Sequence, residues 1–348
     1  IIMLATSLTF DGALRQALSP LLIGSTIRPM CRETIQDPRR LLPVLEKERI
    51  TYWSSVPSLW LRLWAVVKKA GEEGAWPPLP HLRMIQLGGE ALPAAPVRRW
   101  QEQYGPRIQF MNSYGPTETT ISATYYHLPA RLETTGIVPI GQALPGICLR
   151  VVDAALKPCA PGETGDLLIG GAPLSPGYWQ DETLTRKKFI TTPDGQRFFR
   201  TGDLVEEQDG LLHFVGRNDR QIKLRGYRLE LEEIEQTLVR HPQIVQAAVV
   251  LVQEDLNQTL VAFLEIAGSG PSLTELRHFL EQTLPPYSIP HRFQVLSALP
   301  LRANGKINDD QLAYIAQSGP VVALRPEPAT DGTQFTETEQ SLAAIWTD

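Results

Sequence analysis

Four short segments of the chain carry residues that could hold a nucleotide and its metal ion. Tyr114, Thr117 and Glu118 bring an aromatic ring, a hydroxyl and a carboxylate together in NSYGPTETT. Asp203 lies on the turn of FRTGDL, and a carboxylate can accept hydrogen bonds from two neighbouring hydroxyl groups at once. Lys306 lies on the glycine-containing turn of PLRANGKI. Together these groups supply the cation, the metal ligand and the fixed hydrogen-bonding partners that activation of a carboxylate by ATP requires.

The remaining segment, GRNDRQIKLRGYRLE, adds positive charge between Asp203 and Lys306. Arg217 in this segment would be a second contact to a nucleotide, toward its ribose or phosphate groups. Each residue also has an ordinary structural interpretation: Tyr114 in a core, Glu118 and Lys306 in solvent, Asp203 in a turn and Arg217 in a surface ion pair. The prediction therefore depends on the ordered combination of segments and not on any single residue.

In this combination and order, the segments resemble those of the adenylation domains of nonribosomal peptide synthetases, within the wider group of adenylate-forming enzymes that includes acyl-CoA synthetases and luciferases. GETGDLLIGG followed by LSPGYW, and LPPYSIP further along, resemble structural motifs of the same domains. The family's Ser/Thr/Gly-rich phosphate loop, SGTTGxPKG, would lie before Ile1. Because the chain opens in a strand pattern and stops in a helix pattern, we expect it to be a piece of a longer polypeptide.

The resemblance implies roles for residues that face ATP. Tyr114 would pack on the adenine ring, with Asn112 at the adenine edge and Gly88 on the nucleotide side of the site. Asp203 would accept hydrogen bonds from both ribose hydroxyls. Arg217 would contact the ribose or a phosphate.

The same resemblance implies the catalytic groups. Thr117 would bind the α-phosphate, and Glu118 would hold Mg²⁺. Lys306 would bridge the substrate carboxylate and the phosphate during adenylation and withdraw afterwards. The cofactors implied are therefore ATP and Mg²⁺, with phosphopantetheine on a partner carrier domain.

A change of conformation is also implied by the resemblance. Asp219 would be the hinge about which a mobile C-terminal domain turns between adenylation and thioester formation. Lys223 and Gly226 would belong to the face that turns toward the site for the thioester step. The ordinary interpretation of Lys223 is a charge on an edge strand.

A substrate pocket follows from the resemblance as well. Asp11 matches the aspartate that amino-acid-activating members place against the substrate's α-ammonium group, although a helix cap is its ordinary interpretation. Transfer of the family's pocket positions gives the lining Asp11, Gly12, Arg15, Ser54, Ile85, Leu87, Ser113, Ile121 and Ser122, with Lys306 above. Arg15 departs from the family, which more often has an apolar or aromatic residue there. If Arg15 points inward, an acidic or polar substrate side chain is expected; if it points outward, it is a solvated helix residue.

The elements that must position these groups begin with an alternation of strands and helices. Up to about residue 134, short apolar runs such as LRMIQLGG and RIQFM alternate with helical patterns such as SLWLRLWAVVKKAG. This alternation predicts an α/β fold with a parallel sheet, in which functional residues gather beyond the carboxyl ends of the strands. NSYGPTETT follows one of these strands directly.

Further domains are predicted from changes in the pattern and composition of the sequence. From about residue 134 to 218, short strands between Gly, Pro and Asp-Gly turns predict a small β subdomain that completes the core of residues 1–218. Residues 219–317 predict a smaller α+β domain, which the resemblance identifies as the mobile one. Residues 318–334 have the composition of a linker. Residues 335–348 restart a helix with a capping-box pattern, and by resemblance they begin a peptidyl carrier domain.

The composition excludes several classes of protein. With 348 residues, 43% hydrophobic and 20% charged, the chain can form about two domains with substantial cores. A net charge of −5 provides no basic surface for nucleic acid. No apolar run reaches the roughly 18 residues of a membrane span. Cys31, Cys148 and Cys159 lack metal-ligand spacing and leave an odd thiol, which predicts a cytoplasmic location, and the six histidines show no zinc pattern.

From these observations and the resemblance we expect the intact parent to convert an amino acid and Mg²⁺-ATP into aminoacyl-AMP and pyrophosphate. It would then pass the acyl group to the phosphopantetheine thiol of a downstream peptidyl carrier domain, beside condensation or other synthetase domains. The chain by itself, without the phosphate loop, is expected to turn over little. The alternatives are an acyl- or aryl-CoA synthetase of the same superfamily and a non-catalytic remnant in a megasynthase.

Overall fold

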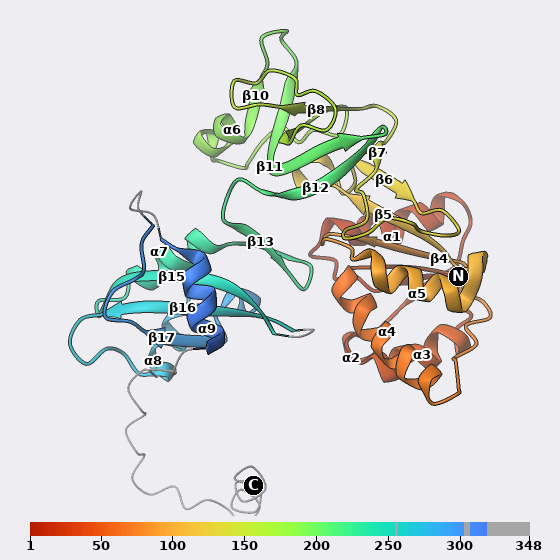
Figure 1. Cartoon of the computed structure of the whole chain (residues 1–348), viewed down its shortest axis with the longest axis horizontal. Coiled ribbons are helices and arrows are strands. Elements are labelled where there is room, and N and C mark those ends of the chain that lie inside the picture. Colours follow the sequence, from red (N-terminus) through yellow and green to blue (C-terminus); the bar gives the residue numbers. More distant parts are fainter. Residues whose placement is uncertain (255–256, 303–306, 319–348) are drawn as a thin grey trace, which may run out of the picture. The chain divides into compact units, whose positions relative to one another are not determined.

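The computed structural model describes residues 1–254, 257–302 and 307–318. It divides into two compact units, Ile1–Arg228 and a second that begins at Leu229 (Figure 1). Lys306, the linker expected to follow the second domain and the expected start of a carrier domain lie outside the described residues. Within the described part, no helix is long and apolar enough to cross a membrane.

The first unit is built on a seven-stranded sheet, and the predicted α/β fold class is confirmed. In spatial order the strands are β2 (Ile27–Pro29), β1 (Ile2–Leu4), β3 (Tyr52–Ser55), β4 (Met84–Gly88), β5 (Gln109–Tyr114), β6 (Thr124–His127) and β7 (Gln142–Ala143). The first five of these run parallel, β6 pairs antiparallel with β5, and β7 pairs antiparallel with β6. The carboxyl ends of β1, β3, β4 and β5 therefore meet at one edge, as the sequence predicts.

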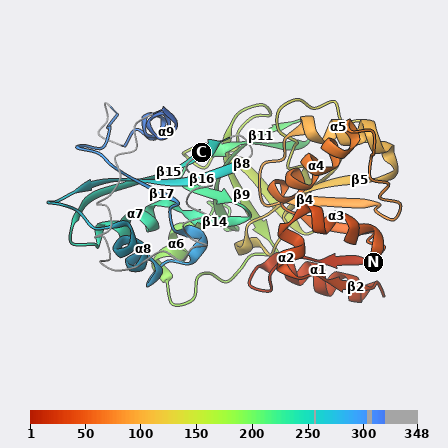
Figure 2. The same cartoon turned by 90° about the horizontal axis from the view of Figure 1, so that it is seen from below.

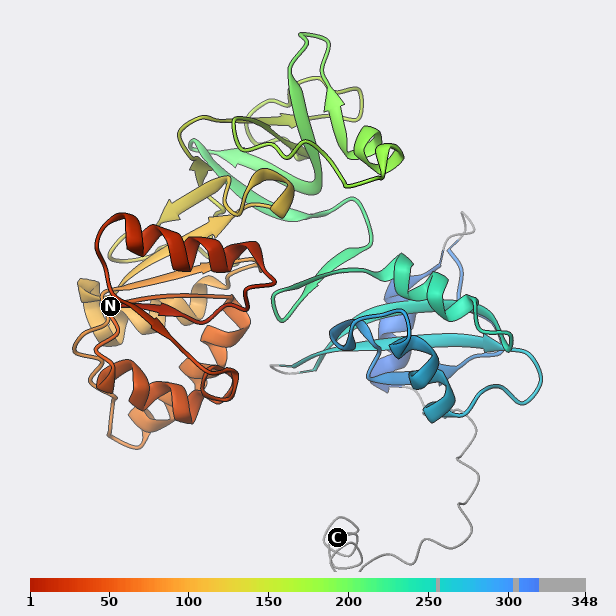
Figure 3. The ribbon, with the colours of Figure 1, turned by 180° about the vertical axis from the view of Figure 1, so that it is seen from behind.

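Helices cover both faces of this sheet. The helix α1 (Asp11–Leu22) lies along one face, and α3 (Pro38–Lys47), α4 (Pro57–Glu72) and α5 (Ala94–Tyr104) lie on the other, as Figure 3 shows. Two shorter elements, α2 (Arg32–Gln36) and the 3₁₀ turn η1 (Gly105–Arg107), connect them to the strands.

The two faces differ in chemistry because neighbouring residues of a strand point to opposite sides. On the side of α4 and α5, Ile85, Leu87 and Phe110 join one apolar core with Trp60 and Trp100, and all five are at most 1% exposed. The residues between them point toward α1. That second face is the one that carries polar side chains.

A second, antiparallel sheet completes the first unit. It has the order β10 (Phe189–Thr191), β11 (Arg197–Gln208), β9 (Gly165–Gly171) and β8 (Ile147–Val152), with β12 (Leu211–Arg217) also paired to β11. The helix α6 (Glu182–Lys188) precedes β10. Asp209 and Gly210 have φ of +51° and +75° in the turn between β11 and β12, as a tight Asp-Gly hairpin requires. The hairpin β13 (Gln221–Leu224) and β14 (Tyr227–Glu230) follows.

One glycine forms the joint between the two sheets. The Gly141 carbonyl accepts a hydrogen bond of 2.8 Å from the Leu212 N–H, and the Leu212 carbonyl accepts one of 2.8 Å from the Ile140 N–H. The Gly141 backbone has φ of +92° and lies against the Tyr125 carbonyl, so that an added Cβ would be 1.9 Å from the Tyr125 oxygen. A residue without a side chain is needed here for the sheets to meet.

The second unit contains a three-stranded sheet with helices on both sides. Its strands are β15 (Ile244–Glu254), β16 (Asn257–Ile266) and β17 (Arg292–Val295), in that order. In Figure 2, α9 (Asp309–Ser318) lies on one side of this sheet, and α7 (Leu231–Val239) and α8 (Leu273–Glu281) lie on the other. A short 3₁₀ turn, η3 (Pro286–Ser288), precedes β17. The division between units falls after Arg228, and the hinge expected at Asp219 stays a prediction.

We expect Gly141→Ala to destabilise the first unit by more than about 3 kcal/mol, because the new methyl group meets backbone in a strained conformation. Gly136→Ala is the matched control: φ there is +75°, but no atom lies within 4 Å of the added Cβ. It should cost only the left-handed backbone penalty of about 1–2 kcal/mol. Urea unfolding followed by tryptophan fluorescence measures both, and equal losses would contradict the role of Gly141 as a joint.

Candidate active site

A bulge in β11 places Asp203. This strand pairs with β9 through Arg200 and again from Leu204, so the residues between leave the ladder. The Thr201 hydroxyl donates to the Leu167 carbonyl at 2.8 Å and accepts the Asp203 N–H at 3.0 Å. Such bulges re-aim side chains, and here the bulge turns the Asp203 carboxylate toward the first sheet.

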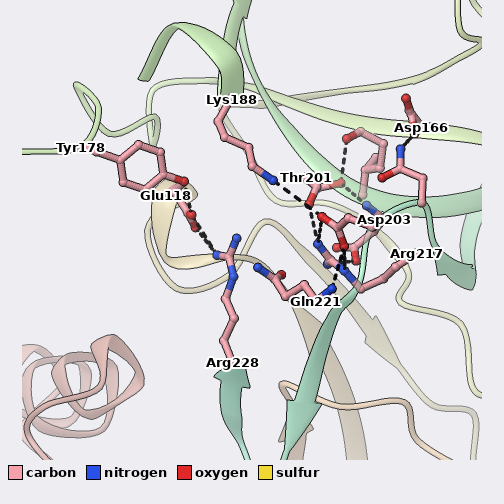
Figure 4. A network of polar contacts seen from close by, with 12 residues as sticks. Glu118, Asp166, Tyr178, Lys188, Thr201, Asp203, Arg217, Gln221 and Arg228 are labelled. Carbon is pink, nitrogen blue, oxygen red and sulfur yellow. Dashed lines mark hydrogen bonds and ion pairs between the residues drawn. The ribbon is translucent and has the colours of Figure 1, made fainter. Parts of the chain in front are cut away.

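Asp203 is the centre of a polar group that we call the Arg217 cluster, made of Tyr114, Thr201, Asp203, Arg217 and Asp219. Figure 4 labels three of them, Thr201, Asp203 and Arg217. The Arg217 Nη1 donates to one carboxylate oxygen of Asp203, and the Tyr114 hydroxyl donates to the other. The Arg217 Nε and Nη2 donate to the two oxygens of Asp219 at 2.7 and 2.9 Å. The cluster therefore joins β5 of the first sheet to β11 and β12 of the second.

Gly202 is required for this arrangement. Its φ is +78°, and a Cβ there would lie 2.6 Å from Asp219 Oδ2 and 3.0 Å from Arg217 Nη2. A side chain here would force the Asp219 carboxylate, and with it the Arg217 guanidinium, to shift. The glycine of the TGD segment thus has a steric role in holding the cluster together.

The charges of the Arg217 cluster reinforce one another. Burial opposes the charge of Arg217, but its hydrogen bonds to Asp219 and the nearby Asp203 charge outweigh burial and raise its pKa above the ordinary value. Burial also opposes ionisation of Asp219, yet Arg217 lowers its pKa below 3.8. Burial and the Asp203 charge raise the pKa of Tyr114 well above 10.0, so its hydroxyl stays protonated as a donor.

Glu118 follows β5 in the 3₁₀ turn η2 (Thr117–Thr119) and is nearly buried. The Tyr178 hydroxyl donates to it at 2.6 Å, and the Arg228 Nη1 contacts its two oxygens at 2.9 and 2.7 Å. Burial opposes ionisation of Glu118, but the Arg228 charge and the Tyr178 hydrogen bond lower its pKa below 4.5. Figure 4 shows this carboxylate between Tyr178 and Arg228. Thr117 lies exposed beside it.

An ionised carboxylate such as that of Glu118 is a suitable ligand for Mg²⁺. It would be the main ligand that this chain supplies. In the described part of the chain, no group of three or more His, Cys, Asp or Glu side chains could hold a metal ion. Mg²⁺ beside a nucleotide commonly takes one or two carboxylates and completes its shell with phosphates and water. In this structure Arg228 holds the Glu118 oxygens, so a cation would have to replace it there.

The hairpin of β13 and β14 contributes further contacts within the first unit. The Lys223 Nζ lies 5.4 Å from the centre of the Tyr114 ring. The Gly226 N–H donates to Glu90 Oε1 at 2.7 Å, and Glu90 also accepts bonds of 2.8 and 3.0 Å from Ser58. Burial lowers the pKa of the Lys223 ammonium group and raises the pKa of the Glu90 carboxyl group. Both side chains belong to this small polar region.

Arg15 points inward, which decides between the two orientations left open by the sequence. Its Nη1 donates to the Ser122 hydroxyl at 2.8 Å, and its Nη2 donates to the Ser54 hydroxyl at 3.0 Å. Nearby, Gln86 Nε2 donates to the Ser113 hydroxyl at 3.0 Å. We call these five residues the Arg15 cluster; Arg15 comes from α1, Ser122 from the turn before β6, and Ser54, Gln86 and Ser113 from the polar face of the sheet.

Two expected pocket residues lie elsewhere, and this is a correction. Ile85 and Leu87 are fully buried in the apolar core on the opposite face of β4. The residue between them, Gln86, pairs in register with Ser54 and shares its face. Tyr52, which donates a hydrogen bond to Gln86, also belongs there and was not predicted. A polar residue inside the apolar run MIQL was the signal that could have identified the correct face.

The remaining predicted residues are placed as follows. Asp11 begins α1, but the cap position belongs to Phe10, and among the described residues no hydrogen bond or ion pair reaches the Asp11 carboxylate. Gly12 faces open space, and Ile121 adopts φ of +71° in the strained turn before Ser122. Asn112 is buried on the other face of β5, where its amide donates to the Pro139 carbonyl at 2.8 Å.

Gly88 lies at the close approach of β4 to β5. A Cβ there would be 2.5 Å from the Ser113 carbonyl oxygen. Glu90, Tyr178 and Arg228 complete the site. Tyr178 and Arg228 were not predicted as functional residues, because their partners are distant in sequence.

The chain is similar to known proteins over most of its length. Residues 1–179 match the family model of the AMP-binding enzymes, and residues 233–306 match that of the AMP-binding enzyme C-terminal domain. Tyrocidine synthase 3 from Brevibacillus parabrevis is 36% identical, with 98% of this chain and 5% of that protein covered. Delta-poly-L-ornithine synthetase from Acinetobacter baumannii (strain AB307-0294) is 36% identical, with 96% of this chain and 23% of that protein covered.

Solved structures with the same arrangement of elements include two adenylation proteins. Holo-PA1221, described as an NRPS protein containing adenylation and PCP domains, has a TM-score of 0.75 at 30% identity, covering 89% of this chain and 52% of that one. The adenylation domain AlmE from Vibrio cholerae, in complex with glycyl-adenosine-5'-phosphate, has a TM-score of 0.76 at 27% identity, covering 91% and 59%. The chain therefore spans only part of the proteins it matches.

We expect Arg217→Ala to destabilise the first unit by about 3–5 kcal/mol at pH 7, because Asp203 loses its ion pair in a buried setting and Asp219 keeps only the longer, 3.6 Å ion pair with Lys188. Arg186→Ala is the matched control: its ion pair with Glu182 is 76% and 87% exposed, and its loss should cost no more than about 0.5 kcal/mol. Urea unfolding provides both values.

The loss of stability caused by Arg217→Ala should depend on pH because of Asp219. Its folded pKa is depressed, so its contribution is present above pH 3.8 and is lost as the pH falls through the folded value. A similar loss in both variants at pH 7 would contradict a cluster that joins the two sheets.

Proposed function

The chain belongs to the AMP-binding enzyme family, among the adenylation domains of nonribosomal peptide synthetases, and on this premise we propose that its parent protein activates an amino acid with ATP. The observation that carries the proposal is the meeting of Tyr114, Asp203 and Arg217 at the joint of two sheets. These groups offer an aromatic face, a carboxylate for a diol and a cation, which are the needs of a nucleoside phosphate.

In the proposed reaction, an oxygen of the amino-acid carboxylate attacks the α-phosphorus of ATP. The new bond gives aminoacyl-AMP, and the bond from the α-phosphorus to the bridging oxygen breaks to release pyrophosphate. Asp203 would fix the ribose: each of its oxygens has one partner here, and a carboxylate has capacity for further hydrogen bonds. Tyr114 would support the adenine. The exposed hydroxyl of Thr117 would bind the α-phosphate.

Glu118 would hold Mg²⁺, which neutralises phosphate charge when it is bound. Its low pKa keeps the carboxylate ionised at neutral pH, which suits a metal ligand. Lys306 would bridge the two reacting anions; this role rests on the family's pattern alone, because Lys306 lies outside the described residues.

The second half of the proposed function is transfer of the acyl group to the phosphopantetheine thiol of a peptidyl carrier domain in the parent protein. Asp219 would be the hinge between the two steps. The contacts of Lys223 with the Tyr114 ring and of Gly226 with Glu90 support the proposal, because they bring the β13–β14 hairpin to the nucleotide side of the first unit. A cytoplasmic location, where the free cysteines stay reduced, belongs to the same proposal.

An amino acid is preferred over other carboxylic acids because of Asp11. Its carboxylate has no partner among the described residues and lies one helical turn before Arg15, where it could meet an α-ammonium group. An acyl- or aryl-CoA synthetase would not need this charge, and exchange supported only by acids without an α-amine would favour that alternative.

We expect Asp203→Asn in the intact parent to raise the KM for ATP by about 10- to 100-fold in amino-acid-dependent ATP–pyrophosphate exchange, because hydrogen bonds to a charged group contribute about 1.5–3 kcal/mol. Asp209→Asn is the matched control: it lies in the exposed turn after the same strand, where asparagine tolerates the positive φ. An unchanged KM in Asp203→Asn would contradict its role on the ribose.

We also propose that residues 1–348 alone support little exchange, because the family's phosphate loop does not occur in this sequence. Exchange by this piece should be at least about 100-fold below that of the parent, since fixed donors around the phosphates supply a large part of catalysis. Circular dichroism would confirm that the piece is folded. Exchange equal to that of the parent would overturn the expectation.

A further inference from the structure

The Arg15 side chain is a cation that reaches into the polar face of the first sheet without an anion to meet it. Its guanidinium contacts two serine hydroxyls, at 2.8 and 3.0 Å. Its Nε is buried and has no hydrogen-bond partner. Among the described residues, no carboxylate lies within ion-pair distance of Arg15. Burial lowers its pKa, and the Tyr52 and Asp11 groups only partly offset that effect.

The groups around the guanidinium have hydrogen-bond donors to spare but no negative charge. Ser54 and Ser122 accept from Arg15, which leaves their own hydroxyl hydrogens available. The Gln86 carbonyl oxygen is occupied by Tyr52, and its amide nitrogen donates to Ser113. A ligand group placed here would therefore meet N–H and O–H donors and one full positive charge, which is the environment of a bound carboxylate.

Asp11 supplies the complementary end. It precedes Arg15 by four residues on α1, so the two side chains share one face of the helix about 6 Å apart along its axis. A carboxylate near the start and a cation one turn later match an α-ammonium group and an acidic side chain on the same small molecule.

We propose that the Arg15 cluster selects an α-amino acid whose side chain ends in a carboxylate. This inference rests on the proposed function, because it assigns the substrate class of the same site. Arg15 would pair with the side-chain carboxylate, with Ser54 and Ser122 donating to it, while Asp11 holds the α-ammonium group. The arrangement rejects the corresponding amide, because an amide leaves the desolvated guanidinium without an anion.

A purely structural role for Arg15 makes a different prediction. In that case its two serine contacts would be sufficient, and the choice of amino acid would be set by other residues. Arg15 would then affect the stability of the protein, but not the ratio of kcat/KM for an acidic amino acid to kcat/KM for its amide. This ratio is therefore the quantity that separates the two roles.

The test is ATP–pyrophosphate exchange by the complete parent protein with aspartate, glutamate, asparagine, glutamine and a set of neutral amino acids. We expect kcat/KM for one of the two acids to exceed that for its own amide by about 100-fold or more. Arg15→Gln should lower kcat/KM for the acid by about 100-fold and leave the amide nearly unchanged. Arg15→Lys should restore part of the activity with the acid, because it keeps the charge.

Arg32→Gln is the matched control, since Arg32 is exposed at the start of α2 and lies outside the cluster. It should behave as the wild type with every amino acid. The comparison of acid with amide in the wild type needs no variant, so a folding defect in Arg15→Gln does not decide the result.

If the protein supports exchange only with a neutral amino acid, and Arg15→Gln does not change the rate, the proposed selection of an acidic side chain is wrong. The proposal that the protein activates an amino acid would still stand. Exchange with no amino acid but with a fatty or aryl acid would overturn both proposals.

Discussion

The site depends on one guanidinium shared by two carboxylates. Arg217 forks onto Asp219 and also donates to Asp203, and Asp203 in turn receives the Tyr114 hydroxyl. Without the arginine, two carboxylates would share a partly buried space, with only the Lys188 ammonium group, 3.6 Å from Asp219, beside them. With it, three strands from two sheets are fixed at one point, beside the turn that carries Glu118. The glycine joint and the bulge of β11 are the backbone features that let this point form.

Much of the fold could be predicted because the relevant signals are local. The alternation of apolar runs with helical patterns identifies the parallel sheet, and the Asp209-Gly210 turn identifies a hairpin. The ordered segments likewise indicated which residues would gather. Tyr114, Asp203 and Arg217 do meet, although they come from strands of different sheets.

The rest of the site could not be predicted because its contacts are long-range. The Gly226 N–H meets Glu90 across 136 positions, and Arg228 meets Glu118 across 110. No local pattern encodes such pairs. The residues expected to line a substrate pocket show a second reason: a shift of one position along a strand exchanges its two faces, so Gln86 occupies the place expected for its neighbours Ile85 and Leu87.

The ion pair between Arg228 and Glu118 has a thermodynamic consequence under the proposed function. If a divalent cation and Arg228 compete for the same carboxylate, each must weaken the other's apparent affinity by the same factor. The fraction of molecules in which Arg228 of the β13–β14 hairpin contacts Glu118 would then vary with magnesium concentration, even when no substrate turns over. A single carboxylate would in this way couple the metal content of the site to the position of a strand whose sequence is more than 100 residues away.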